Sequence, residues 1–411
     1  MTDSNTATAA IPVPDASDIF TKVAAFEQAN QLRAAGLFPY FQPLGGQLGN
    51  EVDVNGNRMV MVCSNDYLGL SQDKRVQQAG LPALEEFGTS CTGSRFLNGT
   101  LALHENLERD LARFLNQEDA LTFSTGFLGS LSVLSALVGR REIMYFDREN
   151  HASLYDGARL SWGELRKFRH GDLDHLEFML KRDADRNVGK MIVTDGVFSM
   201  SGEVADLPGI IRLARKYGAR VMVDDAHSTG VMGPNGRGTA EHYGCEDEVD
   251  IIIGTFSKAF ASVGGFMAGP ADVVDYVKCM ARPFIFTAAL PPAQVASTHA
   301  SLKILASEPI HRERLWKRVA IFREGLRELG FDTMKSEGPI VPVLIGEFDH
   351  VFGFWKKIWD RGVFALPAVP PAVPPGECLI RMAVNASHSR EEIDRVLDAF
   401  AEVGRETGMI S

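Results

Sequence analysis

Cysteine is scarce in this sequence and occurs five times in 411 residues, at Cys63, Cys91, Cys245, Cys279 and Cys378. The five positions form no Cys-x-x-Cys pair, and no histidine stands near them at a spacing typical of metal ligands. The sequence therefore predicts neither a disulfide framework nor a metal site. Free thiols are typical of a reducing cytoplasm, which is the location we expect.

Basic charge is also in deficit. Lys and Arg number 42 against 53 Asp and Glu, a net charge of −11, which argues against a surface that binds nucleic acid. The N-terminus lacks a basic region followed by an apolar core, so we expect no signal peptide. A long uncharged stretch, 121–139, is interrupted by Ser, Thr and Gly and is too polar for a membrane span. It predicts a buried helix preceded by a turn.

What is present is typical of a large α/β protein. The composition is 45% hydrophobic and 23% charged, and 411 residues exceed one ordinary core, so two or three packed units are expected. Strand-like runs alternate with helical patterns such as 207–217, which indicates a mostly parallel sheet covered on both faces. The predicted strands are 143–146, 191–194, 220–223, 251–253 and 265–268, with 340–345 and 378–384 nearer the C-terminus.

Three parts are predicted along the chain. Residues 1–60 form an N-terminal segment with a mobile tail up to residue 17, a helix over 19–35 and a β-hairpin that turns at Asn55-Gly56. Residues 61–292 form the large α/β domain. Residues 293–411 form a smaller C-terminal α/β domain, which opens with a helical region that reaches about Leu329.

Lys258 lies in the run Gly254-Thr-Phe-Ser-Lys, which directly follows the apolar strand predicted at 251–253. Lysine is rarely buried without a partner, so a structural reason for its position is weak. A desolvated lysine loses its proton more readily, and a neutral amine forms a Schiff base with an aldehyde. The position therefore favours a Schiff-base lysine.

Two carboxylates and an imidazole end the preceding strand, at Asp224, Asp225 and His227. Ligands of open α/β sheets bind at the carboxyl ends of strands, so these side chains are placed for a site; the alternative is that they cap the next turn. An aldehyde cofactor with a basic ring nitrogen needs a carboxylate to keep that nitrogen protonated, and Asp224 is the candidate.

Three further candidates have open alternatives. The segment 123–130 opens a predicted helix with small residues and is either a phosphate cradle or an ordinary helix start. His151 either has a structural role or stacks on a planar cofactor. Arg381 lies in an apolar strand and needs an anion, which is either a carboxylate ligand or a structural ion-pair partner.

Other conspicuous segments predict no site. The glycine-rich segment 230–238 does not fit Gly-x-Gly-x-x-Gly and is interpreted as a tight surface turn. His104 and the acidic cluster 246–248 have no metal-ligand company and are interpreted as solvated surface.

Taken together, these segments resemble the α-oxoamine synthases, a family of fold-type I enzymes that depend on pyridoxal phosphate. The resemblance runs from about residue 40 to the C-terminus and implies the aminotransferase-like fold, with a large mostly parallel-sheet domain and a smaller C-terminal one. The motifs that carry it are Ser64-Asn-Asp-Tyr-Leu-Gly, Ser124-Thr-Gly-Phe, Asn150-His-Ala-Ser, Asp195-Gly-Val-Phe-Ser-Met, Val223-Asp-Asp-Ala-His, Gly254-Thr-Phe-Ser-Lys and Pro291-Pro.

The resemblance implies a role for each matching residue. Lys258 would hold pyridoxal phosphate through the Schiff base and act as general base, Asp224 would pair with the ring nitrogen, and His227 would bond the ring hydroxyl. His151 would stack on the ring, and Arg381 would bind the amino-acid carboxylate. The other residues implied are Gly126, Phe127, Thr255 and Ser257 at the phosphate, Asp195 and Ser199 lining the pocket, and Thr287 and Asn65 serving it from its edge or from the partner subunit of a homodimer.

The reaction implied is a decarboxylative Claisen condensation of an amino acid with an acyl thioester. Segments 92–100 and 281–292 resemble soluble bacterial members that make 3-ketodihydrosphingosine, a sphingolipid precursor, from L-serine and palmitoyl-CoA. Some of those members carry an arginine where this chain has Val369, so one carboxylate contact is lost here. Members that use alanine or glycine remain alternatives, as does a non-catalytic partner subunit, against which Lys258 argues. The carrier of the acyl group, CoA or a carrier protein, and peripheral membrane contact by the enzyme stay open.

Overall fold

The computed structural model describes residues 18–24, 26–46 and 48–411, and the tail predicted for residues 1–17 lies outside them. The chain forms two compact units, divided between Gln42 and Pro43, and each is described by itself. The first contains α1 (Thr21–Ala24) and α2 (Glu27–Ala34). The prediction of one continuous helix over 19–35 is therefore wrong, because Phe26, with φ −80° and ψ 63°, lies outside the helical region and α2 begins after it.

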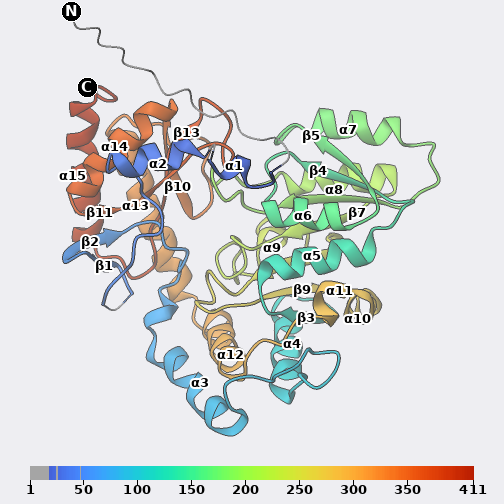
Figure 1. Ribbon diagram of the computed structural model, residues 1–411. Coiled ribbons are helices and arrows are strands. Elements are labelled where there is room, and N and C mark those ends of the chain that lie inside the picture. The colour runs from blue at the N-terminus through green and yellow to red at the C-terminus, as the bar shows by residue number, and fades with distance from the viewer. Residues whose placement is uncertain (1–17, 25, 47) are drawn as a thin grey trace, which may run out of the picture. The chain divides into compact units, whose positions relative to one another are not determined.

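A seven-stranded sheet organises the second unit (Figure 1). Within this sheet only β9 runs antiparallel to its neighbours, so the predicted, mostly parallel sheet is confirmed. From one edge to the other its strands are β3 (Asp119–Phe123), β9 (Gly265–Gly269), β8 (Ile251–Thr255), β7 (Arg220–Asp224), β6 (Lys190–Asp195), β4 (Ile143–Asp147) and β5 (Glu164–Phe168).

The two edge strands, β3 and β5, lie outside the predicted set. The residues of β5 are Glu-Leu-Arg-Lys-Phe. Three charged residues in five positions give no apolar strand pattern, and such a strand is tolerated at the edge of a sheet. The residues of β3 overlap the uncharged stretch 121–139, so the strand merges in the sequence with the helix that follows it.

Helices cover both faces of this sheet. Side chains from α5, α6 and α10 pack on one face against alternate residues of the strands, such as Met222 and Ile253. The intervening Val221 and Val223 point to the opposite face, where α8 packs. The helices up to this point are α3 (Lys74–Phe87), α4 (Ala102–Phe114), α5 (Gly126–Leu137), α6 (Ala152–Leu160), α7 (Leu173–Arg182), α8 (Leu207–Tyr217), α9 (Thr239–Tyr243), α10 (Ala271–Met280) and α11 (Arg282–Ile285).

The C-terminal region continues with two long helices and a small sheet. The helical region predicted to reach Leu329 is divided at Glu308-Pro309 into α12 and α13, and α12 lies beside α3, far from it in sequence (Figure 1). The elements are α12 (Pro292–Ser307), α13 (Ile310–Glu328), β10 (Ile340–Gly346), α14 (Phe348–Asp360), β11 (Val363–Phe364), β12 (Leu366–Ala368), β13 (Cys378–Ala383) and α15 (Arg390–Glu406).

The predicted hairpin is confirmed as β1 (Glu51–Val54) and β2 (Asn57–Met61), and β11 extends it in parallel with β2. The chain beyond β2 is tied to the C-terminal region, because Ala383 N donates to Val62 O at 2.7 Å. This pairing brings Asn65 beside the central strand β13, which carries Arg381. The boundaries predicted at residues 60 and 292 stay a prediction. In the part of the chain that the structure describes, no helix is long and apolar enough to cross a bilayer.

Candidate functional site

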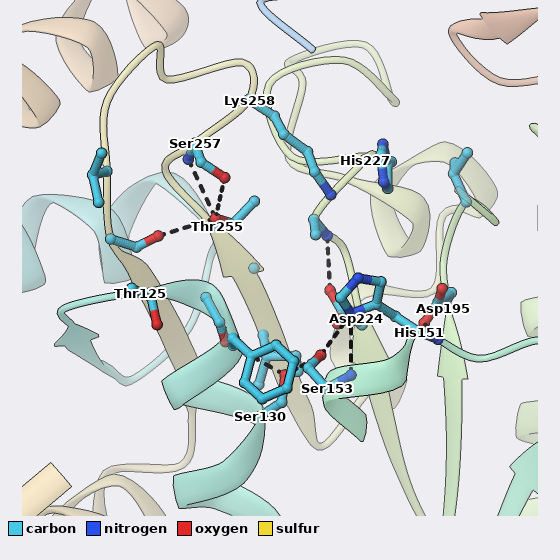
Figure 2. A pocket seen from close by; sticks show the side chains of 18 residues that line it. Thr125, Ser130, His151, Ser153, Asp195, Asp224, His227, Thr255, Ser257 and Lys258 are labelled. Carbon is cyan, nitrogen blue, oxygen red and sulfur yellow. Dashed lines mark hydrogen bonds between the residues drawn. The ribbon is translucent and has the colours of Figure 1, made fainter. Parts of the chain in front are cut away.

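A cavity of about 310 Å³ lies at the carboxyl ends of the parallel strands. The ends of β6, β7 and β8, the first turns of α5 and α6, and the loop after β8 form its wall, and Figure 2 shows their side chains converging. Ligands of open α/β sheets bind at this edge. Nine residues predicted from the sequence line the cavity: Lys258, His151, Asp224, His227, Gly126, Phe127, Thr255, Ser257 and Asp195.

Lys258 reaches into this cavity from the loop that follows β8 (Figure 2). Its side chain is half-buried, and no described residue forms a hydrogen bond or ion pair with its Nζ. Burial lowers the pKa of Lys258 to about 8, although the charge of Asp224 opposes this shift. A substantial share of the amine is therefore neutral near pH 8, which is the form that attacks an aldehyde.

The adjacent carboxylates Asp224 and Asp225 differ in their surroundings. Asp225 is fully buried and accepts hydrogen bonds from Thr239 N at 2.9 Å and Thr239 Oγ1 at 2.7 Å, so it ties the end of β7 to the start of α9 and does not line the cavity. Asp224 does line the cavity, and its Oδ1 accepts a bond from Ala226 N at 3.0 Å. Burial raises the pKa of Asp224, against the opposing charges of Lys258 and His151.

Asp195 ends β6 directly beside Asp224 on β7. Burial and the negative charge of Asp224 raise the pKa of Asp195. Its Oδ1 accepts a bond from His151 N at 3.3 Å, so Asp195 holds the start of α6 against the end of β6. This contact fixes where His151 stands at the rim of the cavity.

His227 is buried beside the cavity and has a partner that the sequence analysis does not single out. The hydroxyl of Tyr67 lies 2.6 Å from its Nδ1. Burial lowers the pKa of His227 far below its usual value, and the positive charges of Lys258 and Arg381 lower it further. The imidazole is therefore neutral at pH 7, with one donor and one acceptor nitrogen.

His151 is the N-cap residue of α6, and one of its ring nitrogens contacts another side chain of the protein. Its Nδ1 lies 2.8 Å from Ser153 Oγ, which in turn lies 3.1 Å from Ser130 Oγ on α5. Partial desolvation lowers the pKa of His151, and the charge of Asp224 opposes this shift. Figure 2 shows the ring beside Asp224 in the wall of the cavity.

A tight cradle lies at the other end of the cavity. A Cβ at Gly126 would stand 2.8 Å from Thr255 Cβ, and one at Gly265 would stand 2.4 Å from the Cα of Gly126, so only glycine allows this approach. Thr255 Oγ1 lies 2.8 Å from Ser257 Oγ. The N–H groups of Gly126 and Phe127 open α5 and have no carbonyl of their own helix to bond, a geometry suited to a phosphate.

Arg381 lies outside the lining of this cavity but close to it. Its Nε donates to Ser199 O at 2.7 Å and one Nη donates to Asn65 Oδ1 at 2.9 Å. No described carboxylate lies within ion-pair distance of its guanidinium. The structural salt bridge that was the alternative is therefore not formed with any described residue, and the guanidinium keeps its capacity for a carboxylate ligand.

Thr287 and His104 both lie outside the lining of the cavity, and only the placement of His104 differs from the prediction. Thr287 does not line the cavity of its own chain, and its hydroxyl donates to Pro283 O at 2.6 Å. His104, predicted to be solvated, is completely buried, because its Nδ1 accepts from Leu101 N at 3.1 Å and its Nε2 lies 2.9 Å from Leu290 O. That prediction is wrong since two backbone groups, one of them 186 residues away, satisfy the ring.

The residues of the cavity fit pyridoxal phosphate. Lys258 is a desolvated amine with no hydrogen-bond or ion-pair partner among the described residues, and Asp224 is a buried carboxylate for a ring nitrogen. The glycine cradle at Gly126 leaves room that any Cβ would fill. In the described part of the chain, no three His, Cys, Asp or Glu side chains cluster as metal ligands would.

Known proteins match nearly the whole chain. The family model for aminotransferase class I and II matches residues 57–400. A serine palmitoyltransferase of Bacteriovorax stolpii is 45% identical over 383 residues, which cover 93% of this chain and 91% of that protein. An 8-amino-7-oxononanoate synthase of Thermoanaerobacter pseudethanolicus is 40% identical over 384 residues, covering 93% and 97%. A solved serine palmitoyltransferase of S. paucimobilis with PLP and myriocin bound superposes with a TM-score of 0.93, at 35% identity, over 96% of this chain and 100% of that one.

Proposed function

We propose that this protein condenses L-serine with palmitoyl-CoA to 3-ketodihydrosphingosine. The chain belongs to the aminotransferase class I and II family and, within it, to the α-oxoamine synthases. The enzyme is then a pyridoxal-phosphate-dependent C-acyltransferase of sphingolipid synthesis. The observation that carries the proposal is that Lys258 and Asp224 line one cavity, in a chain 45% identical to a serine palmitoyltransferase.

The chain offers a group for each part of the cofactor. Pyridoxal phosphate, when bound, supplies an aldehyde that captures amines and a ring that takes up the electron pair of an adjacent carbanion. Lys258 would anchor it, and Asp224 would keep the ring nitrogen protonated. The N–H groups of Gly126 and Phe127 would hold the phosphate, with the hydroxyls of Thr255 and Ser257 beside them.

Lys258 and Arg381 would handle the amino acid. The Nζ of Lys258, when it is not bound to the cofactor, would take the proton from the substrate α-carbon and would return a proton after carbon dioxide has left. Arg381 would hold the substrate carboxylate, helped by Asn65, which already bonds its guanidinium. Val369 is half-buried at the end of β12 and offers no charge, so this recognition would rest on one arginine.

A second cavity, of about 790 Å³, supports a long acyl chain as the other substrate. It shares His151 with the first cavity, and its lining includes Phe198, Met200, Met334 and the proline-rich segment 370–375. Each methylene group buried from water contributes about 0.8 kcal/mol, so the apolar part of this lining favours a long chain over a short one. The activity measured with each thioester decides whether CoA or a carrier protein delivers that chain.

The runner-up is condensation of alanine or glycine with a different thioester, since relatives named 8-amino-7-oxononanoate synthase are nearly as similar. A non-catalytic partner subunit is disfavoured, because Lys258 is present and lines the cavity. We also place the enzyme in the cytoplasm, which the five free cysteines support, and expect it to touch membranes only peripherally to release a lipid product.

A substrate panel tests the proposal. The purified protein, loaded with pyridoxal phosphate, is given L-serine, L-alanine or glycine in combination with palmitoyl-CoA, an acyl carrier protein thioester or a short-chain acyl-CoA. We expect thiol release and 3-ketodihydrosphingosine, identified by mass spectrometry, from serine with a palmitoyl thioester. Turnover only with alanine or glycine and a short acyl group would establish the runner-up instead. A Lys258→Ala protein is the control, because background thioester hydrolysis does not need the amine.

A further inference from the structure

Tyr67 is a buried residue that the mechanism above does not use. It lies two residues after Asn65, in the loop that follows β2, and its side chain is completely buried. Its hydroxyl is 2.6 Å from Nδ1 of His227, which is 160 residues away in sequence. A buried tyrosine hydroxyl needs a hydrogen-bond partner, and here that partner is a ring at the cavity wall.

The neighbouring bonds indicate which atom carries the proton. The hydroxyl has a second acceptor within reach, Asn65 Oδ1, but this contact of 3.3 Å is longer than the 2.6 Å contact with Nδ1. The shorter contact, to Nδ1, is therefore the one to which Tyr67 donates. Burial raises the pKa of Tyr67 to about 12, so its proton stays on the oxygen at neutral pH.

A neutral imidazole that accepts at Nδ1 carries its proton on Nε2. Since Tyr67 occupies Nδ1, Nε2 is the nitrogen left to a ligand in the cavity, and it is available only as a donor. The same hydroxyl touches Asn65, which bonds Arg381, so one chain of hydrogen bonds joins the proposed carboxylate clamp to the wall of the cofactor cavity.

We propose that Tyr67 is a positioning residue that fixes His227 in the Nε2–H tautomer, so that the imidazole can donate a hydrogen bond to the ring oxygen of the cofactor. The proposal rests on the proposed function only in requiring pyridoxal phosphate, and not in the choice of amino acid or thioester. Without the bond from Tyr67, the imidazole would be free to present a lone pair to that oxygen, which repels it.

Nitrogen-15 NMR of the imidazoles tests the proposal directly, in the protein with and without bound pyridoxal phosphate. We expect the His227 signal, identified by its loss in His227→Gln, to show a protonated Nε2 and an unprotonated Nδ1. Tyr67→Phe keeps the ring and removes the donor, and should give a mixture of tautomers. Tyr145→Phe is the matched control. Tyr145 is equally buried, its hydroxyl donates to Asp183 Oδ2 at 3.1 Å, and neither residue lines the cavity.

A pH titration of the visible absorbance of the loaded protein gives a second readout. A hydrogen bond from Nε2–H favours the ionised ring oxygen, so Tyr67→Phe should shift the titration by about one pH unit, the size of effect that one hydrogen bond supports. A wild-type protein with its proton on Nδ1 of His227 would overturn the proposal even if the variant failed to fold. So would a folded Tyr67→Phe protein with an unchanged tautomer and titration. Failure of the serine reaction alone would leave both readouts unaffected.

Discussion

At the scale of single residues, the two groups that matter most, Lys258 and Asp224, control each other's protonation because they face one desolvated cavity. Capture of an aldehyde needs the neutral amine, and burial lowers the pKa of Lys258 to about 8. We expect the rate at which cofactor-free protein binds pyridoxal phosphate covalently to rise with pH through about 8, well below the value of about 10.4 for a free lysine. Stopped-flow visible absorbance across this pH range measures it.

The sign of the coupling supplies the control. The carboxylate of Asp224 raises the pKa of Lys258 against the effect of burial. Asp224→Asn removes that charge, so the midpoint of the rate profile should move to lower pH. Lys258→Ala should give no covalent product after borohydride reduction. A midpoint that stays in place in Asp224→Asn would show that the two groups are not coupled.

Single residues were predictable to different degrees. Lys258 and Asp224 could be predicted because a charged residue directly after an apolar strand is costly unless the sheet edge uses it. The contact of Tyr67 with His227 could not, since it joins residues 160 positions apart that only the packed fold brings together. A signal for Tyr67 was available, as it lies within the Ser64-Asn-Asp-Tyr segment, but nothing local names its partner.

At the scale of elements, the loop that presents His151 is held by an ion-pair cluster. The turn after β5 carries His170, whose Nδ1 lies 2.9 Å from Asp147 Oδ1 at the end of β4. Its Nε2 lies 3.5 Å from Glu203, and Gly171 N donates to the other oxygen of Asp147 at 2.9 Å. Two strand ends and the loop 148–151 are thereby fastened around one imidazole.

This cluster predicts a loss of stability at alkaline pH. Burial alone would lower the pKa of His170, but its interactions with Asp147 and Glu203 raise it to about 10. An unfolded chain has a histidine pKa of about 6.5, so the folded protein binds the extra proton between these values. The stabilisation is complete below about pH 6.5 and is lost as the pH rises through about 10. We expect the free energy of unfolding in urea to fall more steeply over this window in the wild type than in His170→Gln.

The comparison needs a histidine outside the cluster. His350 is exposed on α14, and His350→Gln should keep the wild-type slope of stability against pH. Parallel curves for the wild type and His170→Gln would mean that the cluster does not hold the proton in the folded state.

Helices and strands were predictable where the pattern of apolar and polar residues agrees with the burial of those residues. They were not predictable where the pattern and the burial conflict. The helix Leu207–Tyr217 has the predicted bounds because an Asp206 cap, an apolar stripe and Gly218 in the left-handed region mark both ends. The edge strand β5 was not predicted, because its charged side chains are typical of a solvent-exposed segment and do not indicate that its backbone pairs with β4. The break between α12 and α13 has a proline as its signal, but no periodicity changes there.

At the scale of the whole molecule, the class of fold followed from alternation of strands and helices, whereas the order of the strands did not. The antiparallel strand β9 inserts between β3 and β8, and nothing in its residues Gly-Phe-Met-Ala-Gly specifies that neighbour. Long-range pairing depends on which helices cover the faces, a property of the assembled core. The candidate site was nevertheless predictable, because parallel strands must end at one edge whatever their order.

Exposed apolar side chains on two joined segments indicate that two chains assemble. Leu97 and Phe286 are 80% and 74% exposed, on segments joined by the Ser94–Ala288 bridge. Large exposed apolar side chains on two joined segments are typical of an interface. The same segment carries Thr287, which does not line the cavity of its own chain. We therefore expect a homodimer of about 90 kDa, twice the 45.0 kDa of the chain, by analytical ultracentrifugation.

Leu97→Asp should weaken this dimer, because it places a charge on an exposed apolar surface that the dimer would bury, and the mass should shift towards 45.0 kDa at low protein concentration. Phe178→Asp is the matched control: Phe178 is 62% exposed on α7 and should tolerate a charge without change of mass. If Thr287 serves the site of the partner subunit, Leu97→Asp should also release pyridoxal phosphate as it dissociates. A wild-type monomer at micromolar concentration, or equal dissociation of both variants, would place the interface elsewhere or remove it.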